Sequence, residues 1–126
     1  MTDSTWGVFV TQIIIMNIRD FDNELLRTGW HEDVSFIFPV FDNVCLTINC
    51  IEYHNNTLFL KDTYRNESIV KTCMNLSLTI ESMDLDDNVE VQFVYEDSNG
   101  KDYLFQRIVT PFTKNNNNVI IEVYLE

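Results

Sequence analysis

The sequence predicts an all-β fold, a single-domain antiparallel β-sandwich of about eight strands. Apolar and polar residues alternate along several segments, for example over 89–95, and this period of two places the apolar side chains on one face of a strand. The chain also contains no alanine, the best helix former, whereas β-branched and aromatic residues are frequent. This composition disfavours a helical fold.

The length of 126 residues suits one domain with its own hydrophobic core, and we expect a single domain over 1–126. Hydrophobic residues make up 45% of the chain, which excludes general disorder. No internal repeat or linker divides the sequence. The expected strands cover 6–16, 33–38, 43–53, 57–61, 68–82, 88–96, 102–110 and 118–125.

Turn signals separate these strands. The run Asp97-Ser98-Asn99-Gly100 is the strongest, because Asn-Gly readily adopts the positive φ values of a tight hairpin. The single helix expected lies near 22–28, with Asp22 as its N-cap and Gly29 at its end. C2-like, immunoglobulin-like and jelly-roll topologies all agree with this strand pattern, so the topology stays open.

The charge of the chain limits its partners. There are 20 acidic and 8 basic residues, which give a formal net charge of −12. Phosphate backbones and anionic membrane surfaces repel such a chain, so we expect no nucleic-acid partner. A protein with a neutral or basic surface is the expected partner.

No motif for a cofactor or a catalytic centre is present, and we expect a non-catalytic protein without a cofactor. The three glycines form no phosphate-binding loop. Cys50 and His54 are four residues apart, a spacing that does not place both on one face of a strand-to-turn segment, and no second pair completes a zinc site. The sequence shows no signal peptide and no transmembrane segment, so an intracellular protein, cytoplasmic or nuclear, is expected.

The best functional hypothesis is a protein–protein interaction module, such as a subunit, an adaptor or a small viral effector. Apolar residues on the outer side of two strands predict an apolar sheet face that binds the partner. An edge strand of the sheet is an alternative contact, and a homo-oligomer through the same face stays open. The expected face consists of Val94, Ile120 and Tyr124, and the acidic loop expected to frame it contains Asp84, Asp86 and Asp87.

Two alternative functions also follow from the acidic residues. The first is a Ca²⁺-dependent, C2-like module that docks on lipid or protein, because loop carboxylates are the ligands that Ca²⁺ prefers. Its expected ligands are Asp20, Asp22, Asp84, Asp86 and Asp87. The second is an acidic chaperone of basic proteins such as histones, which predicts binding that weakens with salt.

Overall fold

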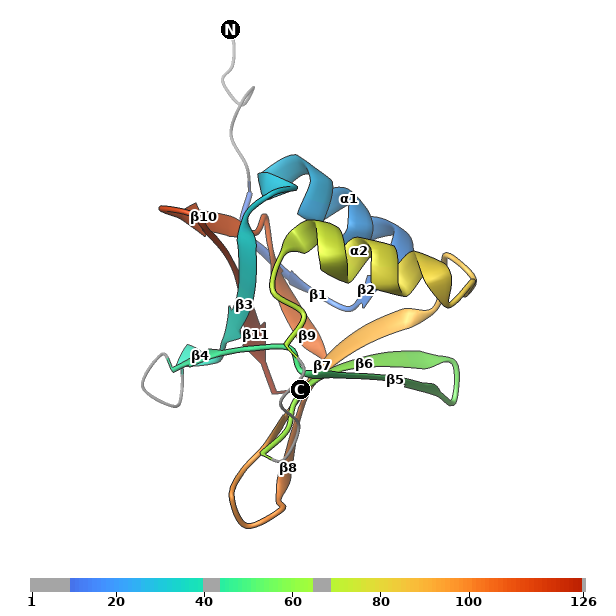
Figure 1. Ribbon diagram of the computed structural model, residues 1–126, viewed down its shortest axis with the longest axis vertical. Coiled ribbons are helices and arrows are strands. Elements are labelled where there is room, and N and C mark those ends of the chain that lie inside the picture. The colour runs from blue at the N-terminus through green and yellow to red at the C-terminus, as the bar shows by residue number, and fades with distance from the viewer. Residues whose placement is uncertain (1–9, 40–43, 65–68, 126) are drawn as a thin grey trace, which may run out of the picture.

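A computed structural model describes residues 10–39, 44–64 and 69–125 of the chain (Figure 1). Within these residues, no helix is long and apolar enough to cross a membrane. In chain order the elements are β1 (Gln12–Ile14), β2 (Met16–Asn17), α1 (Ile18–Gly29), β3 (Asp33–Ile37), β4 (Cys45–Leu46), β5 (Cys50–His54), β6 (Thr57–Asp62), α2 (Cys73–Ser82), β7 (Glu90–Glu96), β8 (Asp102–Phe105), β9 (Arg107–Thr110), β10 (Thr113–Asn115) and β11 (Asn118–Tyr124).

The strands form two sheets, which confirms the expected mostly β, sandwich-like fold. The six-stranded sheet has the order β1-β9-β11-β3-β4, and β10 also pairs with β11. The five-stranded sheet has the order β2-β7-β6-β5, and β8 also pairs with β7. Two pairs, β3 with β11 and β6 with β7, are parallel, so the expectation of a purely antiparallel arrangement was wrong. The connection from β6 to β7 contains α2, and parallel strands are usually joined by such a helical crossover.

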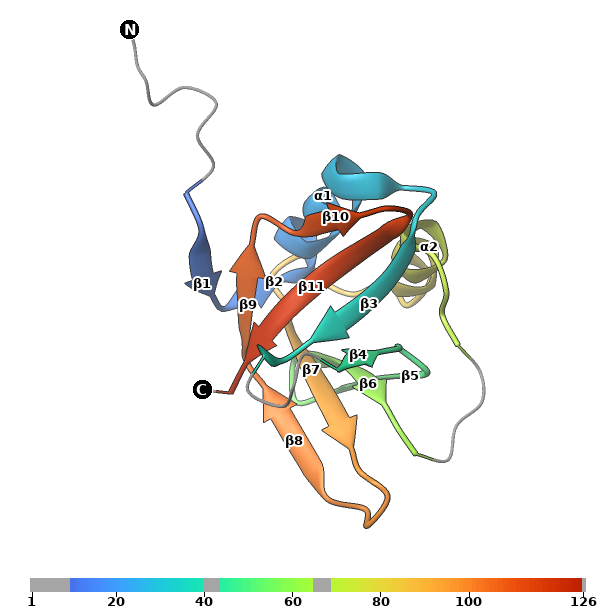
Figure 2. The same ribbon diagram turned by 90° about the vertical axis from the view of Figure 1, so that its left-hand side faces the viewer.

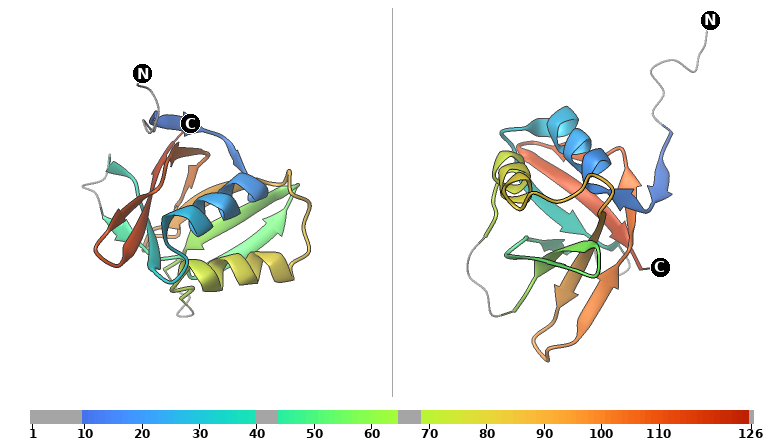
Figure 3. Two further views of the ribbon diagram at one scale, coloured as in Figure 1. Left: turned by 90° about the horizontal axis from the view of Figure 1, so that it is seen from above. Right: turned by 90° about the vertical axis from the view of Figure 1, so that its right-hand side faces the viewer.

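The two helices lie over one face of the five-stranded sheet (Figure 3). They are neighbours of one another, because the amide of Met74 at the start of α2 donates to the carbonyl of Trp30 just after α1. The six-stranded sheet flanks this assembly on the side of β3 and β11 (Figure 1). The core therefore lies between the two sheets and the helix pair.

Phe93 of β7 is at the centre of the core and is fully buried. Its ring lies 4.7 Å from that of Phe36 on β3 and 6.0 Å from that of Phe21 on α1. Phe21 in turn meets Phe112 edge-on at 5.7 Å. These aromatic contacts join both sheets to α1, and each such pair contributes about 1 kcal/mol beyond the area it buries.

The largest correction concerns 68–82, which was expected to be a strand. Residue 68 lies outside the described residues, and 73–82 form α2. The side chain of Thr72 caps this helix by accepting a hydrogen bond from the amide of Asn75. The helix buries Cys73, Leu76, Ser77 and Ile80, at the i, i+3, i+4, i+7 spacing of a helical face.

The first helix is longer than expected. It begins at Ile18 rather than near 22, and its N-cap is Asn17, whose side chain accepts a hydrogen bond from the amide of Asp20 at 2.9 Å. The expectation that Asp22 caps the helix was therefore wrong. The side chain of Asp22 accepts a hydrogen bond from Ser77 of α2 instead, which ties the two helices together.

Three expected strands are each divided into two, because the chain passes from one sheet to the other within them. In the segment 6–16, of which 6–9 lie outside the described residues, Ile15 separates β1 of one sheet from β2 of the other. Gln106 likewise separates β8 from β9. The expected strand 43–53, of which residue 43 lies outside the described residues, contains both β4 and β5. The hairpin at 97–100 is confirmed, because it joins β7 to β8 and Gly100 has a φ of +80°.

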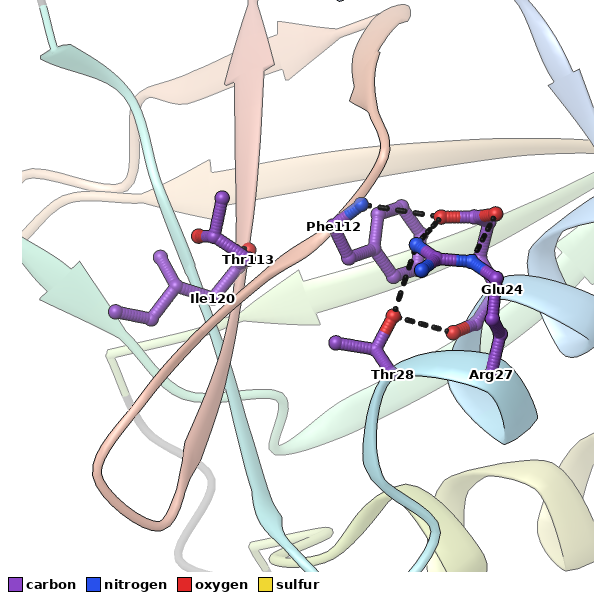
Figure 4. Close-up of polar contacts among 6 residues, drawn as sticks. All are labelled: Glu24, Arg27, Thr28, Phe112, Thr113 and Ile120. Atoms are coloured by element: carbon purple, nitrogen blue, oxygen red, sulfur yellow. Dashed lines mark hydrogen bonds and ion pairs between the residues drawn. The ribbon is translucent and has the colours of Figure 1, made fainter. Parts of the chain in front are cut away.

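A polar contact anchors α1 to the segment between β9 and β10 (Figure 4). The carboxylate of Glu24 accepts the amide of Phe112 at 3.0 Å and two hydrogen bonds from Arg27, at 2.7 and 3.1 Å. Burial alone would raise the pKa of Glu24, but these hydrogen bonds and the positive charge of Arg27 outweigh it and lower the pKa. The carboxylate therefore stabilises the fold in its charged form.

We expect the Glu24→Gln variant to lose about 1–2 kcal/mol of unfolding free energy at pH 7, because charge-assisted hydrogen bonds are lost. Since the pKa of Glu24 is lower in the folded chain, its contribution is present above about pH 4 and disappears as the pH falls through the folded pKa. Chemical unfolding of both proteins at neutral and acidic pH measures this difference. Glu81→Gln, at an exposed position of α2, is the control, and an equal loss for both variants would contradict the role of Glu24.

Candidate functional site

The three apolar residues expected on one face lie on two different sheets. Ile120 and Tyr124 are half-buried residues of β11, where they alternate with the fully buried Val119, Ile121 and Val123. Val94 belongs to β7 of the five-stranded sheet and is only 4% exposed. The expectation of a single face with Val94 was therefore wrong, because β7 and β11 are not neighbours.

Ile120 and Tyr124 lie on the side of the six-stranded sheet that faces away from the core. Figure 4 shows Ile120 pointing away from Phe112, whose ring turns towards α1. Opposed residues on paired strands share one side of a sheet, and the register extends this side across β1, β9, β3 and β4. We define the outer face by Ile13, Ile37, Cys45, Arg107, Val109, Ile120, Glu122 and Tyr124.

In the part of the chain that the structure describes, no helix lies over the outer face, although Val109 is only 8% exposed. Figure 2 looks onto it, with β9, β11 and β3 side by side and both helices behind them. Ile13 is 52% exposed, and Ile37, Ile120 and Tyr124 are each partly exposed. This face thus presents a row of apolar side chains from several strands to the solvent.

A groove of about 650 Å³ lies at one end of the outer face. Ile120 and Cys45 line it together with Ile69 and Lys71 from the segment that leads into α2. Ile69 is 57% exposed, so the groove has apolar walls that are open to a partner. Its volume is sufficient for a large side chain of a bound protein.

Positive and negative charges balance on and beside the outer face. Asp33 and Glu122 supply two negative charges, and Lys71 and Arg107 supply two positive charges. Neither Lys71 nor Arg107 forms an ion pair with a residue in 10–39, 44–64 or 69–125. In a chain of net charge −12, this surface is locally neutral.

Tyr124 and Glu122 are joined on the outer face. The Tyr124 hydroxyl donates a hydrogen bond to the Glu122 carboxylate. This hydrogen bond, together with burial and the negative charge of Glu122, raises the pKa of Tyr124. The contact holds the Tyr124 hydroxyl at Glu122, and Arg107 is the registered partner of Tyr124 on β9.

The acidic loop does not frame the outer face. Asp84, Asp86 and Asp87 lie in the connection from α2 to β7, at the opposite side of the helix pair from β11 (Figure 1). Asp84 and Asp87 line a groove of about 240 Å³ between α1 and α2, and Asp87 forms an ion pair with Arg19 at 3.3 Å. The expected acidic frame was wrong because 73–82 form a helix, which carries the loop away from the six-stranded sheet.

The five expected calcium ligands do not form a metal site. Asp22, Asp84 and Asp87 all line the groove between the helices, but Asp22 accepts from Ser77 and Asp87 pairs with Arg19. Asp20 and Asp86 do not line that groove. Across the described ranges, no group of three His, Cys, Asp or Glu side chains is arranged to hold a metal ion.

Val94 lies in a separate groove on the exposed side of the five-stranded sheet. This groove, of about 310 Å³, is lined by His54, Phe59, Lys61, Val94, Asp102 and Leu104. His54 stacks on Phe59 at 4.6 Å, and Lys61 is held by Glu52 at 2.7 Å. The positive charge of Lys61 in this groove is thus neutralised by Glu52 of the same chain.

Two of the three thiol groups, those of Cys50 and Cys73, are poorly suited to nucleophilic chemistry. Burial raises the pKa of Cys73 to about 12, and burial together with the Glu52 carboxylate raises the pKa of Cys50. Because the thiolate is the nucleophile, these groups stay unreactive at neutral pH. Cys50 and His54 both belong to β5 and therefore share a side of the strand, contrary to expectation, but about 13 Å separates them along it.

Sequence reasoning missed Ile13, Ile37, Val109 and Arg107 of the outer face. A signal was present, since each alternates with a core residue, as Ile37 does with Phe36 and Phe38. The missing information was which strands are neighbours.

Comparison with protein-family models, with curated proteins and with solved structures gives no match to this chain.

We expect calcium to leave the melting temperature of the protein unchanged, because the carboxylates do not converge on one point. A site with a dissociation constant near 10 µM would add about 2.7 kcal/mol at about 1 mM Ca²⁺, which is a shift of several degrees. Thermal unfolding with calcium and with a chelator measures this. A rise in melting temperature that grows with calcium concentration would contradict the structural assignment.

Proposed function

We propose that this protein is a non-catalytic protein–protein interaction module that binds its partner through the outer face of the six-stranded sheet. The observation that carries this proposal is a row of partly exposed apolar side chains across several strands, uncovered among the described residues. Exposed apolar surface of this kind marks interaction sites, because its burial is favourable by roughly 25 cal/mol per Å².

The charge pattern favours a partner with a neutral surface. The two negative and two positive groups at the outer face cancel, so a strongly charged partner surface would meet like charges there. The overall charge of −12 repels acidic proteins at longer range. The role is that of a subunit or an adaptor that recognises one protein surface.

Other features support a non-catalytic role without a cofactor and an intracellular location. The buried and half-buried thiols have raised pKa values, which disfavours a cysteine nucleophile. Cys45, Cys50 and Cys73 are all free thiols, and free cysteines are typical of reducing compartments. These features agree with a cytoplasmic or nuclear binding protein.

The proposal predicts that Ile120→Asp abolishes partner capture while the fold survives. A carboxylate at this position would lose its hydration against the apolar partner surface, and we expect at least about a tenfold loss of captured partner. The experiment uses the tagged full chain in an extract of the cells that produce it.

Leu104→Asp is the matched control, because Leu104 is 47% exposed on the other sheet. Tyr124→Ala is a second variant that tests the other end of the outer face. Thermal unfolding shows that each variant folds. Undiminished capture by Ile120→Asp, or loss of capture by Leu104→Asp, would refute the assignment of the outer face.

A further inference from the structure

We propose that a second copy of this chain binds to the outer face, so that two copies form a symmetric dimer. The inference rests on the docking surface proposed above and names its occupant. In a two-fold symmetric interface the same surface serves both subunits, and every contact occurs twice. The surface must therefore be complementary to itself, and its charges meet this condition.

Arg107 and Glu122 are the two charged residues of the outer face, and they lie near the end of the face that Tyr124 marks. They lie on the adjacent strands β9 and β11, where Arg107 is opposite Tyr124 and Glu122 is two residues from Tyr124. Arg107 forms no ion pair with the described residues, and Glu122 accepts a hydrogen bond from Tyr124. In the proposed dimer, a two-fold axis near β9 and β11 would set Arg107 of each copy against Glu122 of the other.

Other partners satisfy this pair of charges less well. A basic surface would match Glu122 but repel Arg107, and an acidic surface would match Arg107 but repel Glu122. A second copy supplies both counter-ions at once, while its Ile120 and Ile13 meet apolar side chains of the same kind. Two twisted sheets stack face to face at about 10 Å with their strands about 30° apart, a separation that these side chains fill.

The size of the face determines how stable the dimer is. Four spacings between five neighbouring strands give a width of about 19 Å, and the seven residues of β11 span about 23 Å. The flat area is roughly 440 Å², below the roughly 800 Å² that each partner buries in a stable complex. The net charge of −12 on each copy also opposes association. We therefore expect a weak dimer with a dissociation constant in the micromolar range or above.

Sedimentation of the purified full chain, from about 10 µM to about 1 mM, tests the dimer and its contacts. We expect wild-type protein to dimerise, and we expect Arg107→Glu and Glu122→Arg each to weaken the dimer at least about tenfold. A mixture of the two variants should restore association. In the mixed dimer, one contact joins the two substituted positions with their charges exchanged, and the other contact keeps the native pair of Arg107 and Glu122.

Lys101→Glu is the control for net charge, because it changes the charge as Arg107→Glu does at a position on the β7–β8 hairpin. It should leave the dimer unchanged. A wild-type chain that stays monomeric over the whole range would overturn the inference, and so would a dimer that both charge reversals leave intact or a mixture that fails to associate. If Ile120→Asp nevertheless abolishes capture of another protein, the proposed function stands and only the identity of the occupant is wrong.

Discussion

The contact of Phe93 with Phe21 and Phe36 holds the two sheets and the first helix in one core. Phe93 comes from the five-stranded sheet, Phe36 from the six-stranded sheet and Phe21 from α1. All three side chains are fully buried. Because side chains alternate along a strand, burying Phe93 and Phe36 also decides which residues of β7 and β3 face the solvent. The outer face is the consequence of this core for β3 and for its parallel partner β11.

The helix pair explains why the two sheets differ in what they expose. Both helices cover the five-stranded sheet on its core side, and Glu24 ties α1 to the amide of Phe112 next to β10. The other side of the six-stranded sheet receives no such cover from the described chain. The exposed Ile13, and Arg107 without an ion pair among the described residues, are therefore available to a binding partner rather than to the core.

Alternation and turn chemistry made the two-sheet, mostly β fold predictable. The buried positions of β11 and the hairpin at 97–100 follow from local sequence alone. The segment 73–82 was misjudged because Leu76 and Ile80 are four residues apart, a spacing that suits both a strand and a helix. The helical cap at Thr72 and the burial of Cys73 favour the helical period of 3.6 residues over the strand period of two.

The candidate site was only partly predictable because strand neighbours are not written in local sequence. Ile120 and Tyr124 were recognised as outward-facing residues, and the structure places both on the outer face. Val94 satisfied the same local criterion but belongs to the other sheet. The pairing of β11 with β3 joins residues more than 80 positions apart, so Ile37 could not be assigned to the face of Ile120 before the structure was known.

Methyl-resolved NMR of the full chain at rising protein concentration tests the outer face as a docking surface most directly. The signals of Ile13, Ile37 and Ile120 report on the outer face, and those of Leu78 and Leu104 report on α2 and the other sheet. We predict that the three isoleucine signals shift together between about 10 µM and about 1 mM while the two leucine signals stay in place. Shifts confined to Leu78 or Leu104 would contradict the outer face as the docking surface, and no shift at any concentration would contradict its occupation by a second copy.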